Sequence, residues 1–111
     1  MSHPYVDTEK GLTMLGGNKA LYHRLLKTYM SSSMYSDAVS AVESGDAAQS
    51  QVALHTLKGA TANLHLEAIY EKSKELELGI KESGVMPTPE AMEELAHIQN
   101  CTLAEIASLV S

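Results

Sequence analysis

The sequence has no tryptophan or phenylalanine, one cysteine and three prolines. A single cysteine, Cys101, cannot form an internal disulfide, which favours a reducing compartment. No apolar run approaches the roughly 20 residues of a membrane-spanning helix. The first residues, MSHPYVD, lack the apolar stretch of a signal peptide. We therefore expect a cytoplasmic protein.

Basic residues are also scarce, with eight Lys and Arg against fourteen Asp and Glu, for a net charge of -6. This balance, with the basic residues scattered, argues against a nucleic-acid partner. The apolar residues are mainly Leu, Ala, Val, Ile and Met, which favour helices over sheets. A chain of 111 residues suits one core. We expect residues 1–111 to form a single domain.

Glycine, proline and capping residues divide the chain into separate helical stretches. The expected helices cover residues 7–16, 18–45, 46–64, 66–83 and 88–110. The expected N-caps are Asp7, Asn18, Asp46 and Thr88. The serines at 31–33 are a weak point, where the second helix can bend. Four long helices with short links predict an all-α fold, an antiparallel up-down four-helix bundle with a short additional N-terminal helix.

Helical spacing predicts which residues face the core. In the second helix these are Tyr22, Leu25, Tyr29, Ser36 and Val39. In the third helix they are Leu54, Leu57, Thr61 and Leu64. In the fourth helix they are Ile69, Ser73, Leu76 and Ile80. The glutamates of the fourth helix are interpreted as a solvated face, with an exposed ion pair between Glu77 and Lys81.

The third helix carries a second, exposed strip. His55, Lys58, Gly59 and Ala62 follow the spacing i, i+3, i+4 and i+7, and Gln51 lies one turn before His55. Glycine inside a helix costs about 1 kcal/mol relative to alanine. Helical side chains lean toward the N-terminus, so a side chain at Gly59 would cover the spot beside His55. The strip therefore predicts a histidine left open to another protein, although a glycine that packs against a neighbouring helix is an alternative.

The stretch ALHTLKGATANL resembles the histidine-containing phosphotransfer (HPt) domains of bacterial multistep phosphorelays. Their signature reads His-x-x-Lys-Gly, then small residues, Asn, an aliphatic residue and Gly. This sequence supplies His55, Lys58 and Gly59, and Asn63 with Leu64. GLTMLGGNKALYHRLLKTY upstream is similar to the start of that family. The usual final glycine is replaced by His65, which tolerates left-handed geometry less well than glycine.

The resemblance implies a mechanism. His55 would be phosphorylated by a receiver-domain phospho-aspartate of a response regulator and would pass the group to another receiver aspartate, while Lys58 stabilises the phosphoryl group. Gln51, Gly59 and Ala62 would contact the partner. The partners would be receivers and a hybrid sensor histidine kinase, for a monomeric carrier with no kinase or hydrolase activity of its own. No cofactor is expected on this chain, because Mg²⁺ would sit on the receiver.

Two alternatives come from other functional classes. The chain could be a helical module that docks on a receiver or histidine kinase without being phosphorylated. A metal-dependent helical enzyme is suggested by Glu94 and His97, which match the Glu-x-x-His motif of di-iron bundles. That site needs a second motif and two further carboxylates, and no other histidine has a glutamate three residues before it.

Overall fold

A computed structural model describes residues 5–110, and all regular elements in that range are α-helices, as predicted. The first is α1 (Thr8–Met14) and the second is α2 (Lys19–Ser31). Asp7 and Asn18 each accept a backbone N–H from the first turn of the helix that follows. Such caps satisfy N–H groups that have no partner within a helix, so these two predicted helix starts are confirmed.

The predicted helix over residues 18–45 is wrong as a single element. It consists of α2 and α3 (Met34–Glu43), with a break at Ser32 and Ser33. Ser32 is extended, with φ -79° and ψ 161°, and its hydroxyl donates to the carbonyl oxygen of Tyr29 at 2.7 Å. Serine hydroxyls compete with the helical hydrogen-bond pattern. Consecutive serines therefore end one helix here, where only a bend was expected.

The break also changes which residues of α3 face the core. Tyr22 and Tyr29 of α2 are buried as predicted, but Ser36 is exposed and Ala38 is fully buried. The prediction for Ser36 is wrong because it continued one helical spacing across a break. A helical period holds only while the helix is continuous.

The remaining elements are three longer helices: α4 (Ala47–Asn63), α5 (Glu67–Ser83) and α6 (Pro89–Val110). Asp46 caps α4 by accepting a backbone N–H. Gly84, with φ 67°, ends α5 in the left-handed conformation that glycine adopts easily. The Thr88 hydroxyl accepts a backbone N–H from the first turn of α6. These three predicted boundaries are confirmed.

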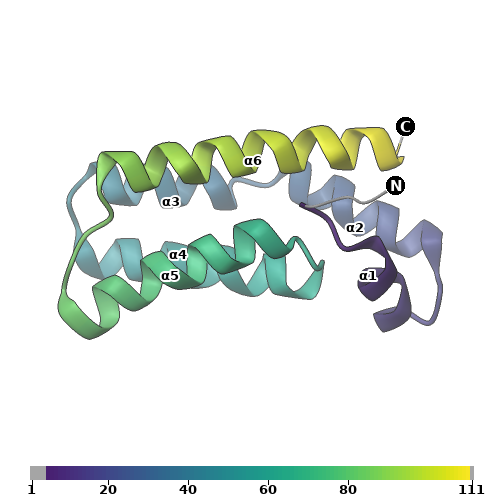
Figure 1. Cartoon of the computed structure of the whole chain (residues 1–111), viewed down its shortest axis with the longest axis horizontal. Coiled ribbons are helices and arrows are strands. Elements are labelled where there is room, and N and C mark those ends of the chain that lie inside the picture. The colour runs from purple at the N-terminus through teal and green to yellow at the C-terminus, as the bar shows by residue number, and fades with distance from the viewer. Residues whose placement is uncertain (1–4, 111) are drawn as a thin grey trace.

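The helices form an elongated bundle of 40 × 22 × 22 Å. In Figure 1, α4 and α5 are antiparallel neighbours, and α6 runs along the length of the molecule. The segments α2 and α3 follow one another along the length of the molecule, where α2 contacts α6 and α3 contacts α4, so together they occupy one position of the four-helix bundle. The short α1 contacts α2. None of the described helices combines the length and the apolarity needed to cross a membrane.

The core is mainly aliphatic, and its buried tyrosines, Tyr22 and Tyr29, donate hydrogen bonds to groups outside their own helix. Its fully buried large aliphatic residues are Leu26, Leu54, Leu57, Leu66, Ile69, Leu95 and Ile106. The buried Tyr22 hydroxyl donates to the carbonyl oxygen of Leu64 at 2.8 Å. Burial raises the pKa of Tyr22 to about 12. Gly11 lies so close to this ring that a Cβ there would be 2.4 Å from it. These contacts join α1, α2 and the end of α4.

Candidate functional site

The two predicted faces of α4 are present. Its core side is buried as predicted: Leu54, Leu57, Thr61 and Leu64. On the other side, 68% of the His55 side chain is exposed. The strip around it contains Gly59, which is exposed, and Gln51 and Ala62, which are half-buried. The structure therefore places the predicted site residues on one accessible surface of α4.

The imidazole of His55 contacts a buried carboxylate of the neighbouring helix. Its Nδ1 atom lies 2.9 Å from Oε2 of Glu77, and the Lys58 ammonium lies 2.6 Å from Oε1 of the same residue. Glu77 itself is only 5% exposed. The Glu77 carboxylate of α5 therefore contacts both of the functional groups predicted on α4, the imidazole of His55 and the ammonium of Lys58.

The position of Glu77 follows from the helical spacing of α5. It comes four residues after Ser73 and one after Leu76, and all three are buried. Residues four apart lie on the same side of a helix, so Glu77 shares the face that α5 turns toward α4. Because α4 and α5 are antiparallel neighbours, the middle of one faces the middle of the other (Figure 1). That register brings Glu77 beside His55.

The interpretation of Glu77 as a solvated residue paired with Lys81 is wrong. The sequence did contain a signal, because Glu77 falls within the buried stripe that includes Ser73 and Ile80. A charge on an apolar face is rarely buried without a partner. The two partners, His55 and Lys58, lie on another helix, so spacing along α5 alone could not identify them.

Glu77 is ionised in this arrangement. Burial alone would raise its pKa, but the hydrogen bonds and positive charges of Lys58 and His55 outweigh burial and lower the pKa below its ordinary value of 4.5. An ionised carboxylate only accepts hydrogen bonds. The hydrogen-bond network therefore assigns the proton to Nδ1 of His55. In the neutral ring, Nε2 then carries the lone pair, so the nitrogen with the available electron pair is the one farther from the backbone.

Gly59 has no packing role in the described structure. A Cβ built at this residue would have nothing within 4 Å, apart from its own helix backbone and chain neighbours. This result removes the alternative that Gly59 is needed for contact with a neighbouring helix. The glycine keeps the surface one turn after His55 free of a side chain, so a partner can approach the ring closely.

His65 lies at the end of α4, away from this site. Its φ is 56°, and within residues 5–110 it is the one residue other than glycine with positive φ. It thus adopts the left-handed conformation for which the HPt pattern uses glycine. Ten residues separate it from His55, roughly 15 Å along a helix. Its ring instead contacts Glu67 and Met14.

The remaining histidines do not build a metal centre in the described part of the chain. His23 is half-buried, His97 is exposed, and His3 lies outside the described residues. Among residues 5–110, no three or more His, Cys, Asp or Glu side chains gather closely enough to hold a metal ion. The Glu94 and His97 motif therefore lacks the further carboxylates that a di-iron bundle requires.

Fold and site together define a helical domain that presents the exposed, oriented imidazole of His55 on the surface of α4. The Hpt domain family model matches residues 28–108, so the chain belongs to the Hpt domain family. It is therefore an HPt domain, of the class that takes part in phosphotransfer within phosphorelay signalling and interacts with receiver domains and kinases. Searches among curated proteins and among solved structures gave no significant match.

Proposed function

We propose that His55 is the phosphorylated residue and that this domain relays a phosphoryl group between receiver-domain aspartates. The observation that carries the proposal is the 2.9 Å contact between Nδ1 of His55 and Glu77. That contact leaves Nε2 as the nucleophilic nitrogen of an exposed ring. The approach is open at Gly59, so the donor can come from another protein.

The transfer needs no general base on this chain. The Nε2 lone pair attacks the phosphorus of an aspartyl phosphate, an N–P bond forms, and the P–O bond to the aspartate breaks with its electron pair leaving on the carboxylate. The ring keeps its Nδ1 proton and becomes positively charged. Glu77 faces that proton, so its negative charge stabilises the charge that develops on the ring. The reverse sequence delivers the group to a second receiver.

Lys58 has two roles in this proposal. Its ammonium, at 2.6 Å, helps to keep Glu77 ionised. Only 27% of its side chain is exposed, so it is held close to the site rather than extended into solvent. When the phosphoryl group is on His55, one turn earlier, the same ammonium provides a positive charge for the phosphoryl oxygens. Lys58 therefore stabilises both the oriented ring and the phosphorylated product.

The partners that fit this site are receiver domains and a hybrid sensor histidine kinase. Gln51, Gly59 and Ala62 would form the contact surface around His55. The Mg²⁺ ion would be held by the receiver, and this chain would need no cofactor and would have no kinase or hydrolase activity of its own. We propose a cytoplasmic location for the protein. We also propose that it is a monomer, because the bundle buries its core without a second copy.

The test is transfer from a phosphorylated receiver to the full chain. We expect the wild-type domain to gain an acid-labile, base-stable label, as a phosphoramidate does. The His55→Ala variant should gain none while keeping its helical circular dichroism spectrum. An acid-stable label, or full labelling of the variant, would contradict the proposal. Receiver binding that is unaffected by His55→Ala, without transfer from any donor, would instead support a docking module.

A further inference from the structure

The Glu77 carboxylate contacts the side of the His55 ring that the proposed phosphoryl group does not use. Its Oε2 atom lies 2.9 Å from Nδ1, whereas the proposed phosphoryl group is bound through Nε2. The two nitrogens lie on different sides of the imidazole, so the arrival of a phosphoryl group leaves the contact with Glu77 in place. This buried carboxylate, 5% exposed, therefore faces the ring in both states of the domain.

The contact with Glu77 favours a proton on Nδ1 of the phosphorylated ring. When Nε2 carries the phosphoryl group, Nδ1 either keeps its proton, which makes the ring positively charged, or releases it. Release would place a lone pair of Nδ1 2.9 Å from a carboxylate oxygen, and both atoms would then only accept hydrogen bonds. The buried carboxylate would lose one of its partners, and an unpaired buried charge is costly. The protonated ring avoids this cost.

Lys58 makes this proton more important once the domain is phosphorylated. Its ammonium lies 2.6 Å from Oε1 of Glu77. A phosphoryl group adds about two negative charges near neutral pH and attracts the same ammonium, because Lys58 lies one helical turn from His55. When Lys58 turns toward the phosphoryl oxygens, the Nδ1 proton becomes the remaining partner of Glu77 among the contacts that the structure describes.

We propose, on the basis of the phosphotransfer function above, that Glu77 holds the Nδ1 proton on phosphorylated His55 and so keeps the phosphoryl group transferable at neutral and mildly alkaline pH. A protonated ring leaves as neutral imidazole: the N–P bond breaks, its electron pair stays on Nε2, and an oxygen of an aspartate or of water bonds to phosphorus. Without this proton the ring would have to leave as an anion, which is a much poorer leaving group. Glu77 is thus a positioning residue that favours onward transfer over long storage of the phosphoryl group.

The charged groups near the phosphorylatable ring come from three helices. Glu77 of α5 contacts the ring directly, and Lys58 of α4 contacts the same carboxylate. From α3, Asp37 lines a groove against the other flank of α4. Lys74 and Lys81 of α5, three residues before Glu77 and four after it, are exposed. Glu77 is the group within hydrogen-bond distance of Nδ1, so the pH dependence is assigned to it.

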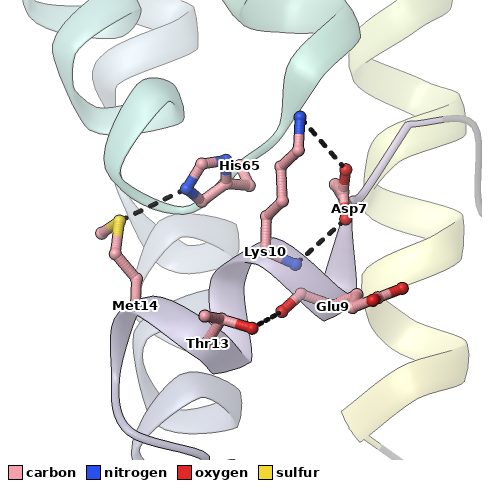
Figure 2. A pocket seen from close by; sticks show the side chains of 6 residues that line it. All are labelled: Asp7, Glu9, Lys10, Thr13, Met14 and His65. Atoms are coloured by element: carbon pink, nitrogen blue, oxygen red, sulfur yellow. Dashed lines mark hydrogen bonds and ion pairs between the residues drawn. The ribbon is translucent and has the colours of Figure 1, made fainter.

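His65 has a similar carboxylate contact but a different environment. Its Nδ1 atom lies 3.1 Å from Glu67, and its Nε2 atom lies 3.3 Å from the Met14 sulfur. Figure 2 shows this ring pointing toward Met14 of α1. The Glu67 side chain is 39% exposed, against 7% for Glu77, so water can solvate it if the contact is lost. His55 therefore combines an exposed ring with a buried carboxylate on Nδ1.

The test measures how fast phosphorylated His55 loses its phosphoryl group at different pH values. The full chain is phosphorylated chemically with phosphoramidate, and the His55 signal in ³¹P NMR spectra is assigned by its absence from His55→Ala. Between about pH 6 and about pH 8, we expect the wild-type rate to change less than about threefold and the Glu77→Gln rate to fall about tenfold or more. No receiver is involved, so failure of receivers to phosphorylate His55 would contradict the proposed function alone.

Glu75→Gln is the matched control, because it removes one negative charge from the same helix. The Glu75 side chain is 69% exposed and contacts Lys72, so this variant should keep the wild-type pH profile. The ¹⁵N chemical shift of Nδ1 in phosphorylated wild-type protein at about pH 8 should be that of a protonated nitrogen, a result that depends on no variant. A deprotonated Nδ1, or parallel rate profiles for wild type and Glu77→Gln, would overturn the proposal. A Glu75→Gln profile like that of Glu77→Gln would also overturn it.

Discussion

Nδ1 of His55 and Oε2 of Glu77 lie 2.9 Å apart, and they connect an exposed ring on α4 to a buried carboxylate on α5. In the proposed mechanism, this pair makes a surface histidine an oriented nucleophile. An isolated exposed imidazole rotates and exchanges its proton between both nitrogens. The Glu77 contact fixes both the ring orientation and the tautomer, and the antiparallel register of α4 and α5 sets its position.

Replacement of Glu77 should change the tautomer of His55. In wild-type protein the neutral ring should carry its proton on Nδ1. Glu77→Ala should return the ring to a mixture of both tautomers, while Glu77→Gln should largely restore the Nδ1–H form, because its amide oxygen still accepts. The ¹⁵N chemical shifts of the ring report this directly. An unchanged tautomer in Glu77→Ala would show that Glu77 does not position the ring.

The same variants should separate orientation from charge in phosphotransfer. Glu77→Gln keeps an acceptor for Nδ1–H but lacks the negative charge that faces the ring. We expect its transfer rate to fall about tenfold, which corresponds to about 1.4 kcal/mol of transition-state stabilisation. Glu77→Ala should lose more, because it also lacks the orientation. Single-turnover rates from a phosphorylated receiver measure both effects, and equal rates for all three proteins would contradict this role.

Acid should destabilise the domain partly through Glu77. The folded-state pKa of this residue is lowered: its burial acts in the opposite direction, but the contacts with Lys58 and His55 prevail. A lowered pKa means that its stabilising contribution is present above the unfolded-state pKa and is lost as pH falls through the folded-state value. As pH falls below about 4.5, the free energy of unfolding should therefore fall more steeply for wild type than for Glu77→Gln. Urea unfolding at several pH values measures the difference, and parallel curves would contradict it.

Alkali should destabilise the domain partly through ionisation of Tyr22. Burial raises its pKa from 10.0 to about 12, so the folded state holds this proton more tightly than the unfolded state. Its contribution is complete below about pH 10 and is lost as pH rises toward 12. Tyr22→Phe should cost about 1 kcal/mol at neutral pH through loss of the hydrogen bond to Leu64. The variant should then lose less stability above pH 10 than wild type, which denaturant unfolding can show.

The sequence predicted most helix boundaries because they depend on local chemistry. Asp7, Asn18, Asp46 and Thr88 each accept a backbone N–H near their own position, so the cap and its helix are neighbours in the chain. The break at Ser32 was only partly predicted. Consecutive serines weaken a helix, but spacing alone does not determine whether the helix bends or ends there.

The candidate site likewise has one part that the sequence predicts and another part that depends on how the helices pack. His55, Lys58 and Gly59 lie within five residues of one helix, so their shared face follows from helical spacing. Glu77 comes 22 residues after His55 and meets it only through the packing of α5 against α4. The contact between His65 and Met14 spans 51 residues. Such contacts depend on tertiary packing, which a one-dimensional pattern does not contain.

Two glycines that look alike in the sequence should respond in opposite ways to the same substitution. Both Gly11 and Gly59 lie inside helices. A Cβ at Gly11 would be 2.4 Å from the Tyr22 ring, whereas a Cβ at Gly59 would meet nothing within 4 Å. Gly59→Ala should therefore raise the free energy of unfolding by about 1 kcal/mol, the difference in helix propensity. Gly11→Ala should lower it by about 1–3 kcal/mol, because the buried ring has to move.

The order of these glycine variants by phosphotransfer rate should differ from their order by stability. Although Gly59→Ala is the more stable protein, its methyl group lies beside the path to His55 and should slow transfer from a phosphorylated receiver. A larger side chain, as in Gly59→Gln, should slow transfer further without loss of helical structure. Gly11→Ala lies in α1 and not on the His55 face of α4, so it should transfer at the wild-type rate wherever it remains folded. Thermal unfolding and single-turnover transfer on the same samples distinguish these effects, and wild-type transfer by Gly59→Gln would show that partners do not approach over this part of α4.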